Sequence, residues 1–438
     1  MHFFDIFINS RAAPKRMKTV AIVGLGYVGL PLACLCAEKG LVVHGVDIDK
    51  RKLDIISQGK SPIDDEYLSK QLGSLKGKIL TTSDAAGAAK KSDITIICVP
   101  TPVDKGHAPD LKPLIGACEA IVPGVHDGIT IVIESTIFPG TVQEIVLPIL
   151  RKSGNKFFLG HCPERIDPGN RKYTVRNLPR VVGGIDKESA EKIAGFYRSI
   201  VEADIVELSS VKAAEATKIM ENTFRDVNIA FVNEMARSFD KAGIDIIEVI
   251  KGASSKPFGF LPHYPGAGVG GHCIAVDPYY LIAKAKEHGF VHEFLILARK
   301  INEEMPAYAV ALLEEQLKMI GEKLSGARVG VLGLSYKGNV DDTRESPAWE
   351  VIHLLKEKEA NVEVFDPHVP AESTAKDIEG LLGKVDSLIL VTNHKEFTSM
   401  DYTLLRENNI KVVIDGRNCL DKDKIKALGI RYHGIGRQ

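Results

Sequence analysis

A lone cysteine ends the glycine-rich stretch "PGAGVGGHC", and an aspartate follows it four residues later. The thiol of Cys273 is a nucleophile of the kind that the oxidation of an aldehyde to an acid requires. The glycines before it would let the backbone approach a substrate closely. Burial as a structural cysteine is the alternative, because most free thiols are buried. The loop alone favours neither interpretation.

Four other polar residues have types suited to acid–base or oxyanion chemistry. Lys218 and Asn222 are four residues apart in a helical pattern, so they share a face; a lysine can stabilise developing negative charge and an amide can orient water. Glu164, in "CPERIDPGN", follows a predicted strand and can act as a general base. Asp277 can hold a catalytic water or the lysine. The alternatives are a solvated helix face for Lys218 and an ion pair between Glu164 and Arg165 or another cation.

The segment "GLGYVG" has the glycine spacing of a phosphate-binding turn. Gly24, Gly26 and Gly29 follow an apolar run, open a helical pattern and precede Asp47 at the end of the next apolar run. The glycines would permit a tight turn and close approach of a pyrophosphate, to which the helix start would supply amide donors. A carboxylate at Asp47 would bind ribose hydroxyls and repel a 2′-phosphate, which predicts NAD rather than NADP. A plain strand–helix turn without a ligand is the alternative.

Other loops carry polar residues just after predicted strands, where open α/β sheets bind ligands. Two of these loops, "VPTP" and "ESTIFPG", contribute Pro100, Thr101, Ser135 and Thr136. Toward the C-terminus, Lys337 and Arg344 lie in "SYKGNVDDTRESP" at a predicted helix start, and Arg417 lies in "VIDGRN" at a late strand end. These cations suggest a second phosphate-bearing ligand. Ordinary turns and surface charge are the alternatives.

Alternating strand and helix patterns must position these residues. From Met17 to about residue 208, short apolar runs such as "DITIICVP", "GITIVIEST", "FFLGHCPE" and "PRVVGG" recur at helix-length intervals, which predicts a doubly wound parallel sheet. "SSVKAAEATKIMENTFRDVNIAFVNEMARSFDKAG" predicts one long helix, with Ser209 or Ser210 as N-cap and Gly243 as its stop. "ARVGVLGLSYK" and "ANVEVFDP" then repeat the first pattern with a degenerate glycine turn. Only the first turn is therefore expected to hold a dinucleotide.

The predicted class is α/β, with two doubly wound, Rossmann-like domains joined by a central helical domain. The chain of 438 residues is too long for one ordinary core. The expected parts are an N-terminal extension (1–16), an NAD-binding domain (17–208), a helical domain (209–320) and a second Rossmann-like domain (321–438). The extension makes a poor signal peptide, and Met17 could equally be the natural start.

Composition argues against several classes of function. The formal net charge is −1 and no basic run interleaves with aromatic residues, so nucleic-acid binding is not expected. No apolar run reaches the roughly 20 residues that cross a bilayer, so no membrane partner is expected. Seven cysteines without paired or zinc-like spacing predict free thiols, no metal site and a cytoplasmic protein.

The chain resembles the UDP-glucose/GDP-mannose dehydrogenase family, because several of its motifs occur in the order found in that family. They are "GLGYVGLP", "VPTP", "ESTIFPG", "CPERIDPG", "AAEATKIMENTFRDVNIAFVNE", "GAGVGGHCIAVDP" and "GLSYKGNVDDTRESP", which together span nearly everything after residue 17. The resemblance implies a four-electron oxidation of the C6 alcohol of a UDP-sugar. Hydride passes to NAD⁺, Cys273 attacks the aldehyde to give a thiohemiacetal, a second hydride leaves to form a thioester, and water releases the uronic acid. It also implies a homodimer built on the long helix.

The resemblance implies a role for each matching residue. The catalytic set would be Cys273 as nucleophile, Lys218 and Asn222 as the oxyanion-stabilising pair, Asp277 orienting them, and Glu164 as acid/base for the water step with Thr136 beside it. The cofactor contacts would be Gly24, Leu25, Gly26, Tyr27, Val28, Gly29, Asp47, Lys52, Pro100, Thr101, Ser135, Thr136 and Arg344. The UDP-sugar contacts would be Glu164, Arg165, Lys218, Asn222, Tyr264, Gly270, Tyr336, Lys337 and Arg417.

The substrate expected from the resemblance is a UDP-N-acetylhexosamine. Family members that act on plain UDP-glucose usually have serine in place of His272 and a second acid soon after the position of Glu164, where this chain reads "RIDPG". "KPFGFLPHYPGAGVGGHC" favours UDP-N-acetylglucosamine, with UDP-N-acetylmannosamine a close second. Family members often carry an arginine near Pro257 that reaches the partner subunit's substrate, and its absence leaves that contact unsupported here.

Three other functions remain open from the residues. The chain could be a UDP-glucose 6-dehydrogenase. It could be a two-electron dehydrogenase of the 3-hydroxyacid or 6-phosphogluconate type, which also pairs Lys with Asn one turn apart but needs neither a catalytic cysteine nor a third domain. It could also be a non-catalytic NAD-binding protein, which would not need Cys273, Lys218 and Glu164 together.

Overall fold

The computed structural model describes residues 17–63, 65–102, 109–166, 172–271 and 274–438. The predicted extension, residues 1–16, lies outside the described residues. Internal contacts divide the chain into two compact units: an N-terminal unit (17–102 and 109–218) and a C-terminal unit (219–438). Because this division separates only two units, the predicted boundaries at residues 208 and 320 stay predictions.

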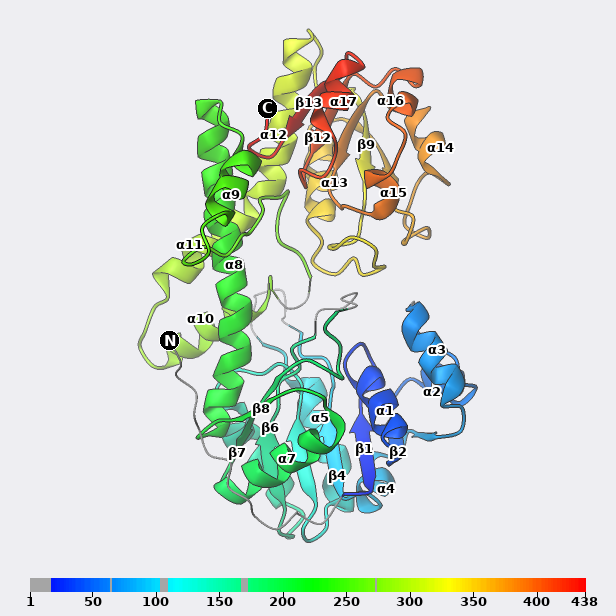
Figure 1. The fold of residues 1–438 in the computed structure, drawn as a ribbon, viewed down its shortest axis with the longest axis vertical. Helices are drawn as coiled ribbons and strands as arrows, with labels where there is room; N and C mark the ends of the chain where they lie inside the picture. Colours follow the sequence, from blue (N-terminus) through cyan, green and yellow to red (C-terminus); the bar gives the residue numbers. More distant parts are fainter. Residues whose placement is uncertain (1–16, 64, 103–108, 167–171, 272–273) are drawn as a thin grey trace. The chain divides into compact units, whose positions relative to one another are not determined.

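The N-terminal unit is built on one eight-stranded sheet with the order β3-β2-β1-β4-β5-β6-β7-β8 (Figure 1). The strands are β1 (Thr19–Val23), β2 (Val42–Val46), β3 (Ile79–Thr82), β4 (Ile94–Ile97), β5 (Thr130–Ile133), β6 (Phe158–His161), β7 (Arg180–Gly184) and β8 (Ile205–Glu207). The order from β3 to β6 is that of a doubly wound dinucleotide-binding domain. The predicted class of this part is confirmed.

One strand pair departs from the predicted parallel arrangement. β6 and β7 run antiparallel, whereas the other neighbours in this sheet are parallel. A parallel return needs a long crossover, usually a helix. The described residues between Phe158–His161 and Arg180–Gly184 contain no helix, so the chain returns in the opposite direction.

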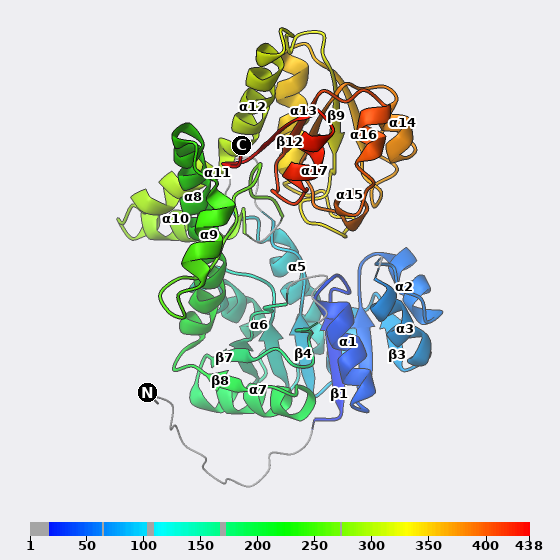
Figure 2. The same ribbon diagram turned by 45° about the horizontal axis from the view of Figure 1, so that its top comes forward.

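Helices cover both faces of this sheet. They are α1 (Gly29–Glu38), α2 (Lys50–Ser57), α3 (Glu66–Ser74), α4 (Ala85–Lys90), α5 (Lys112–Ile121), α6 (Leu147–Arg151) and α7 (Lys187–Ile200), with a short 3-10 turn (Val122–Gly124) and a π turn (Val142–Val146). Along β1, Val20 and Ile22 pack with α1 and α7, while Ala21 and Val23 pack with α4 and α5. Figure 2 shows α1 and α7 in front of the sheet. The strand period of two thus fills two cores, as in other doubly wound sheets.

The long helix predicted in the middle of the chain is α8 (Val211–Ala242). Its first turn is capped as predicted, because Ser210 Oγ accepts a hydrogen bond from the Ala213 amide at 3.2 Å. Its end is also as predicted, since Gly243 follows with a φ of 69°, a left-handed conformation that glycine adopts without strain. Lys218 is the last α8 residue of the N-terminal unit.

The C-terminal unit contains a five-stranded parallel sheet with the order β10-β9-β11-β12-β13. Its strands are β9 (Arg328–Leu332), β10 (Asn361–Phe365), β11 (Ser387–Leu390), β12 (Val412–Asp415) and β13 (Arg431–Gly434). The helices are α9 (Ile246–Ser254), α10 (Asp277–Glu287), α11 (Glu293–Glu303), α12 (Met305–Met319), α13 (Pro347–Glu357), α14 (Ile378–Leu382), α15 (Lys395–Thr398), α16 (Thr403–Glu407) and α17 (Lys422–Ala427).

This second sheet is also packed on both faces, so the predicted second Rossmann-like domain is confirmed as a fold. α12 and α13 cover one face of the sheet, and α14, α16 and α17 cover the other. None of the helices described is both long enough and apolar enough to cross a bilayer.

Candidate active site

The glycine turn after β1 has the geometry that its spacing predicts. Gly24 has a φ of 94° and donates its amide to Val46 O at 2.8 Å. A Cβ on Gly29 would lie 1.9 Å from Gly24 O, so α1 can begin this close to the strand only with glycine there. A Cβ on Gly26 would meet nothing within 4 Å. The turn therefore leaves open space at Gly26, where a pyrophosphate is expected to approach.

Asp47 follows β2 and is nearly buried, with 9% of its surface exposed. Its Oδ2 accepts the Leu25 amide at 2.9 Å, and its Oδ1 accepts the Asp49 amide at 2.9 Å. Each oxygen keeps one further acceptor position, which matches the two hydroxyls of an unphosphorylated ribose. Lys52, on α2, is half-buried. The residues of this turn fit NAD.

Two loops at the carboxyl ends of β4 and β5 are tied to each other. Thr101 Oγ1 donates to Thr136 O at 2.7 Å, and Ser135 Oγ donates to Val99 O at 2.7 Å. Thr101 and Ser135 are buried, whereas Pro100 is exposed. The structure therefore brings these predicted cofactor contacts to the sheet edge that carries the glycine turn.

Glu164 lies three residues after β6 and is 7% exposed. Its Oε1 accepts the amides of Arg165 and Ile166, at 2.6 and 2.8 Å. Its Oε2 forms an ion pair with Arg180 Nη2 at 2.8 Å. The predicted alternative, pairing with a cation, is thus present, but the partner is Arg180. The Arg165 side chain instead donates to Pro179 O.

Lys218 is buried on α8, not solvated. Burial, together with the positive charge of Lys218, lowers the pKa of His161, the last residue of β6, to about 3. The lysine is therefore close to the carboxyl end of β6, from which Glu164 follows. Within the N-terminal unit the structure places both predicted catalytic groups at one strand end.

Sequence reasoning missed two groups that hold these loops. Glu215, one turn before Lys218, accepts the amides of Gly140 and Val142 at 2.6 and 2.8 Å, so α8 anchors the "ESTIFPG" loop. Burial raises the pKa of Glu215 to about 7. Arg180, the first residue of β7, is almost fully buried and also pairs with Glu134. The sequence signal for Arg180 was a charged residue at the start of an apolar run, which indicates a buried ion pair.

In the C-terminal unit, the predicted catalytic residues Asn222 and Asp277 meet. Asn222 Nδ2, on α8, donates to Asp277 Oδ2 at 2.5 Å, and Asp277 is buried at the first turn of α10. The carboxylate thereby fixes the orientation of the amide. Cys273, the predicted nucleophile, lies outside the described residues.

The glycine loop before Cys273 packs against predicted UDP-sugar contacts. A Cβ on Gly270 would lie 2.8 Å from Tyr336 Cβ, and one on Gly266 would lie 3.0 Å from Arg417 Nη1. Arg417 donates Nε to Val391 O at 2.7 Å and Nη2 to Tyr336 O at 3.3 Å. The structure thus brings Gly270, Tyr336 and Arg417 together, and the glycines serve this packing.

The other predicted contacts in this unit are less enclosed. Tyr264 is 57% exposed and Lys337 is half-buried. Arg344 precedes α13, whose N-cap Ser346 and first residue Pro347 are as predicted. Its guanidinium pairs with Asp342 through Nε at 2.9 Å and Nη2 at 2.6 Å.

The second glycine turn, after β9, has the same backbone geometry as the first, but protein groups occupy the acid that faces it. Gly333 has a φ of 93° and donates its amide to Phe365 O at 2.9 Å, as Gly24 does to Val46 O. The acid after β10, Asp366, accepts the amides of Leu334 and Ser335, the Ser335 hydroxyl and His394 Nε2 on a single oxygen. Although burial raises the pKa of Asp366, these hydrogen bonds, led by His394, hold it well below its usual range. This saturation supports the prediction that only the first turn holds a dinucleotide.

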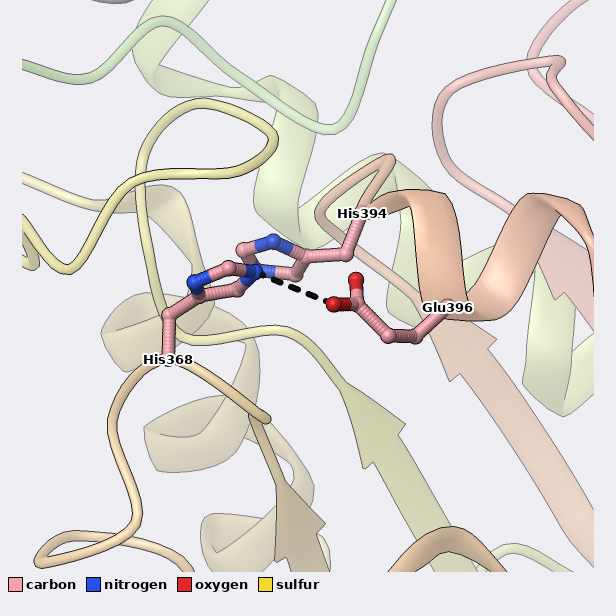
Figure 3. Close-up of side chains that lie close together, drawn as sticks. All are labelled: His368, His394 and Glu396. Atoms are coloured by element: carbon pink, nitrogen blue, oxygen red, sulfur yellow. Dashed lines mark ion pairs between the residues drawn. The ribbon is translucent and has the colours of Figure 1, made fainter. Parts of the chain in front are cut away.

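His368, His394 and Glu396 lie close together in this unit (Figure 3). His394 Nε2 is 3.0 Å from Asp366 Oδ2, and its Nδ1 accepts the Asn339 amide at 2.9 Å. Both ring nitrogens are therefore used, and neither has a lone pair for a cation. The His368 ring stacks on His394 at a centroid distance of 4.7 Å. We assign no metal to this group.

The six described cysteines are free thiols, five of them buried. Burial raises the pKa of Cys34, Cys118 and Cys162 to about 12, and raises the pKa of Cys36, Cys98 and Cys419 further. Such thiols form little thiolate near neutral pH, so they are poor nucleophiles. Cys273 is the remaining candidate of the seven.

Comparison with known proteins matches these units to one family. The models of the UDP-glucose/GDP-mannose dehydrogenase family match residues 18–201 (NAD binding domain), 212–304 (central domain) and 330–422 (UDP binding domain). A UDP-N-acetyl-D-mannosamine dehydrogenase of Methanococcus vannielii is 37% identical over 96% of this chain and 98% of its own. A UDP-N-acetyl-D-glucosamine 6-dehydrogenase of Pseudomonas aeruginosa is 38% identical over 92% of this chain and 98% of its own.

A solved structure agrees with these relatives. The UDP-D-ManNAc dehydrogenase from Pyrococcus horikoshii superimposes with a TM-score of 0.89 at 36% identity, over 96% of this chain and 99% of that chain. Together with the glycine turn and Asp47, these similarities show that the chain belongs to the UDP-glucose/GDP-mannose dehydrogenase family and is an NAD-dependent oxidoreductase.

Proposed function

We propose that this enzyme oxidises the C6 hydroxyl of a UDP-N-acetylhexosamine to the UDP-uronic acid in two steps. The observation that carries the proposal is full-length similarity, at 37% and 38% identity, to relatives named for UDP-N-acetylmannosamine and UDP-N-acetylglucosamine. The two identities do not separate the epimers. The loop sequence before Cys273 favours UDP-N-acetylglucosamine, so both sugars belong in the test.

The proposed chemistry uses the residues to which the family resemblance gives catalytic roles. NAD⁺, when bound at the glycine turn, would supply the hydride acceptor for both oxidations, and the hydroxyl proton of the first oxidation leaves to water. The ammonium of Lys218 stabilises the oxyanion that forms at C6, and Asn222, oriented by Asp277, donates to the same oxygen. The Cys273 thiolate attacks the aldehyde, and the thioester that follows the second oxidation is hydrolysed by water. Glu164 accepts the proton of that water.

The stoichiometry of NADH tests this proposal. We expect two NADH per sugar consumed when limiting UDP-N-acetylglucosamine or UDP-N-acetylmannosamine is mixed with excess NAD⁺ and absorbance is followed. Turnover of UDP-glucose alone would indicate the UDP-glucose 6-dehydrogenase alternative. One NADH per sugar would contradict the thioester route and favour a two-electron dehydrogenase.

We also propose that the enzyme is a homodimer formed through α8. Met220, Phe224 and Phe231 are 72%, 51% and 54% exposed, and their spacing places them on one side of the helix. Apolar side chains in such a row are typical of a covered surface. A second copy is the occupant that we propose, because the central domain of the family is expected to dimerise.

A paired substitution tests the dimer. Phe224→Glu combined with Phe231→Glu should convert the protein from a dimer to a monomer in light scattering, because each buried charge would lack a partner. Tyr67→Glu, at an aromatic residue on α3 that is 59% exposed, should leave the mass unchanged. A wild-type protein that is already monomeric at micromolar concentration would contradict the proposal.

We propose the cytoplasm as the site of action. The six described cysteines are free, which is typical of a reducing compartment. After cell fractionation, dehydrogenase activity should be recovered with cytoplasmic marker enzymes. Recovery with an extracytoplasmic fraction would contradict this placement.

A further inference from the structure

Glu164 is held by an arginine to which the proposed reaction gives no role. Arg180 begins β7, and its side chain is 3% exposed. Its Nη2 pairs with Glu164 Oε2 at 2.8 Å, and its Nη1 pairs with Glu134 Oε1 at 2.9 Å. One guanidinium therefore bridges two carboxylates that lie on different loops of the sheet edge.

The hydrogen bonds of Glu164 leave it one acceptor position. A carboxylate has about four, two on each oxygen. Among the described residues, Oε1 accepts two amides, from Arg165 and Ile166, and is full. Oε2 accepts only Arg180. The position that can take a proton is thus on the oxygen that Arg180 holds, so the guanidinium sets its direction.

Arg180 is itself fixed from several sides. Its guanidinium lies 5.0 Å from the centroid of the Tyr197 ring. The Tyr197 hydroxyl donates to Glu134 Oε1, and Cys98 Sγ donates to Glu134 Oε2 at 3.8 Å. A planar fork clamped by a carboxylate and an aromatic face has little freedom to turn.

The charges of this cluster favour a proton on Glu134. With both ionised, the cluster has one uncompensated negative charge away from water, which is costly. Burial raises the pKa of Glu134 to about 7; Arg180 offsets this in part and the charge of Glu164 adds to it. A proton taken up by Glu134 near neutrality leaves Arg180 and Glu164 as a balanced pair.

We propose that Arg180 is a positioning residue that aims the open acceptor position of Glu164 Oε2 at the attacking water in thioester hydrolysis. The inference rests on the proposed function. In this step the water oxygen bonds to the thioester carbon and its proton moves to Glu164 Oε2. The carbon–sulfur bond breaks, and its electron pair leaves on the Cys273 sulfur as thiolate. Nothing is oxidised, so no further reactant is needed.

Rapid-mixing kinetics of Arg180→Met test the inference, because hydride transfer precedes the water step. At saturating NAD⁺ and sugar, the variant should release a burst of two NADH per subunit at the wild-type rate. Steady-state turnover should then be about 100-fold slower. Protein quenched with acid should carry the added mass of the UDP-uronyl thioester.

Three further variants separate positioning from stability. Arg180→Met with Glu134→Gln removes the guanidinium together with the second carboxyl group that pairs with it, so no ionisable Glu134 is left buried without its partner. This double variant should fold even if the single variant does not, and should still stall after the burst. Arg180→Lys should recover part of the turnover, since lysine keeps the charge but not the fork. Arg198→Met removes an arginine from the exposed ion pair with Glu207 and should behave as wild type.

Two results would overturn the inference. One is a loss of the burst and of the steady-state rate in equal proportion in the double variant. The other is a wild-type steady-state rate in the same variant. Failure of the proposed function is distinct, because the wild-type enzyme itself would then form fewer than two NADH per sugar consumed.

Discussion

The Gly29→Ala variant is expected to lose NAD affinity and thermal stability together. Its Cβ would lie 1.9 Å from Gly24 O and 3.2 Å from Cys98 Cβ, so the start of α1 must move away from β1. Overpacking of this kind costs about 1–3 kcal/mol. If the same strain opposes the turn that binds pyrophosphate, affinity for NAD should fall about 10- to 100-fold. Titration calorimetry and a thermal melt measure the two effects.

Two other glycines provide matched controls. Gly26→Ala adds a methyl group where nothing lies within 4 Å, so it should melt as wild type and yet bind NAD more weakly. Gly116→Ala, in α5 and also without neighbours within 4 Å, should keep affinity and gain up to about 1 kcal/mol from helix propensity. Wild-type NAD affinity in Gly29→Ala would contradict the placement of the cofactor at this turn.

The glycine turn and its acid could be predicted because their signal is local. Three glycines, an apolar run on each side and Asp47 lie within one strand–helix–strand unit, and each constraint acts between near neighbours in the chain. The α8 boundaries were predictable for the same reason, since Ser210 and Gly243 act on the adjacent turns.

Features that depend on distant partners were not predictable. Glu164 and Arg180 are both visible as charged residues, but sequence reasoning suggested Arg165 as the first partner. The ion pair with Arg180 exists because β6 and β7 are adjacent and antiparallel, a pairing that the strand pattern did not indicate. A charge inside an apolar run signals a buried partner without identifying it.

The glycine turns after β1 and β9 also differ in a way that depends on a distant partner. Asp47 and Asp366 each follow a second strand and each accept an amide from the glycine turn. They differ because His394, 28 residues after Asp366, occupies the second carboxylate. The sequence shows that Ser335 replaces the middle glycine of the turn. It does not show that the fold brings His394 onto Asp366.

The sequence explains the glycines before Cys273 by close approach of the backbone to a substrate, and the structure adds a second cause. Gly270 has no room for a Cβ, which would lie 2.8 Å from Tyr336 Cβ, and Gly266 has little, because its Cβ would lie 3.0 Å from Arg417 Nη1. Gly270 is therefore needed for protein packing whether or not a sugar is bound. Composition alone does not distinguish close approach to a ligand from close approach to another part of the chain.

The Cys273→Ser variant is expected to stop after the first oxidation. Formation of the UDP-uronic acid should fall by roughly a thousand-fold or more, as when other covalent nucleophiles are removed. The first hydride transfer needs Lys218 and no thiol, so it should persist. With an aminooxy compound present to trap the aldehyde, the variant should yield one NADH per sugar and an oxime, which mass spectrometry detects.

Cys118→Ser is the matched control, because it removes a thiol from α5, away from the proposed site. Its hydroxyl can bond to the carbonyl one turn earlier, so the helix should be kept. This variant should still give two NADH per sugar. If Cys273→Ser also gave two, with uronic acid formed at the wild-type rate, Cys273 would not be the nucleophile. One NADH per sugar from the wild-type enzyme and both variants would instead identify a two-electron dehydrogenase.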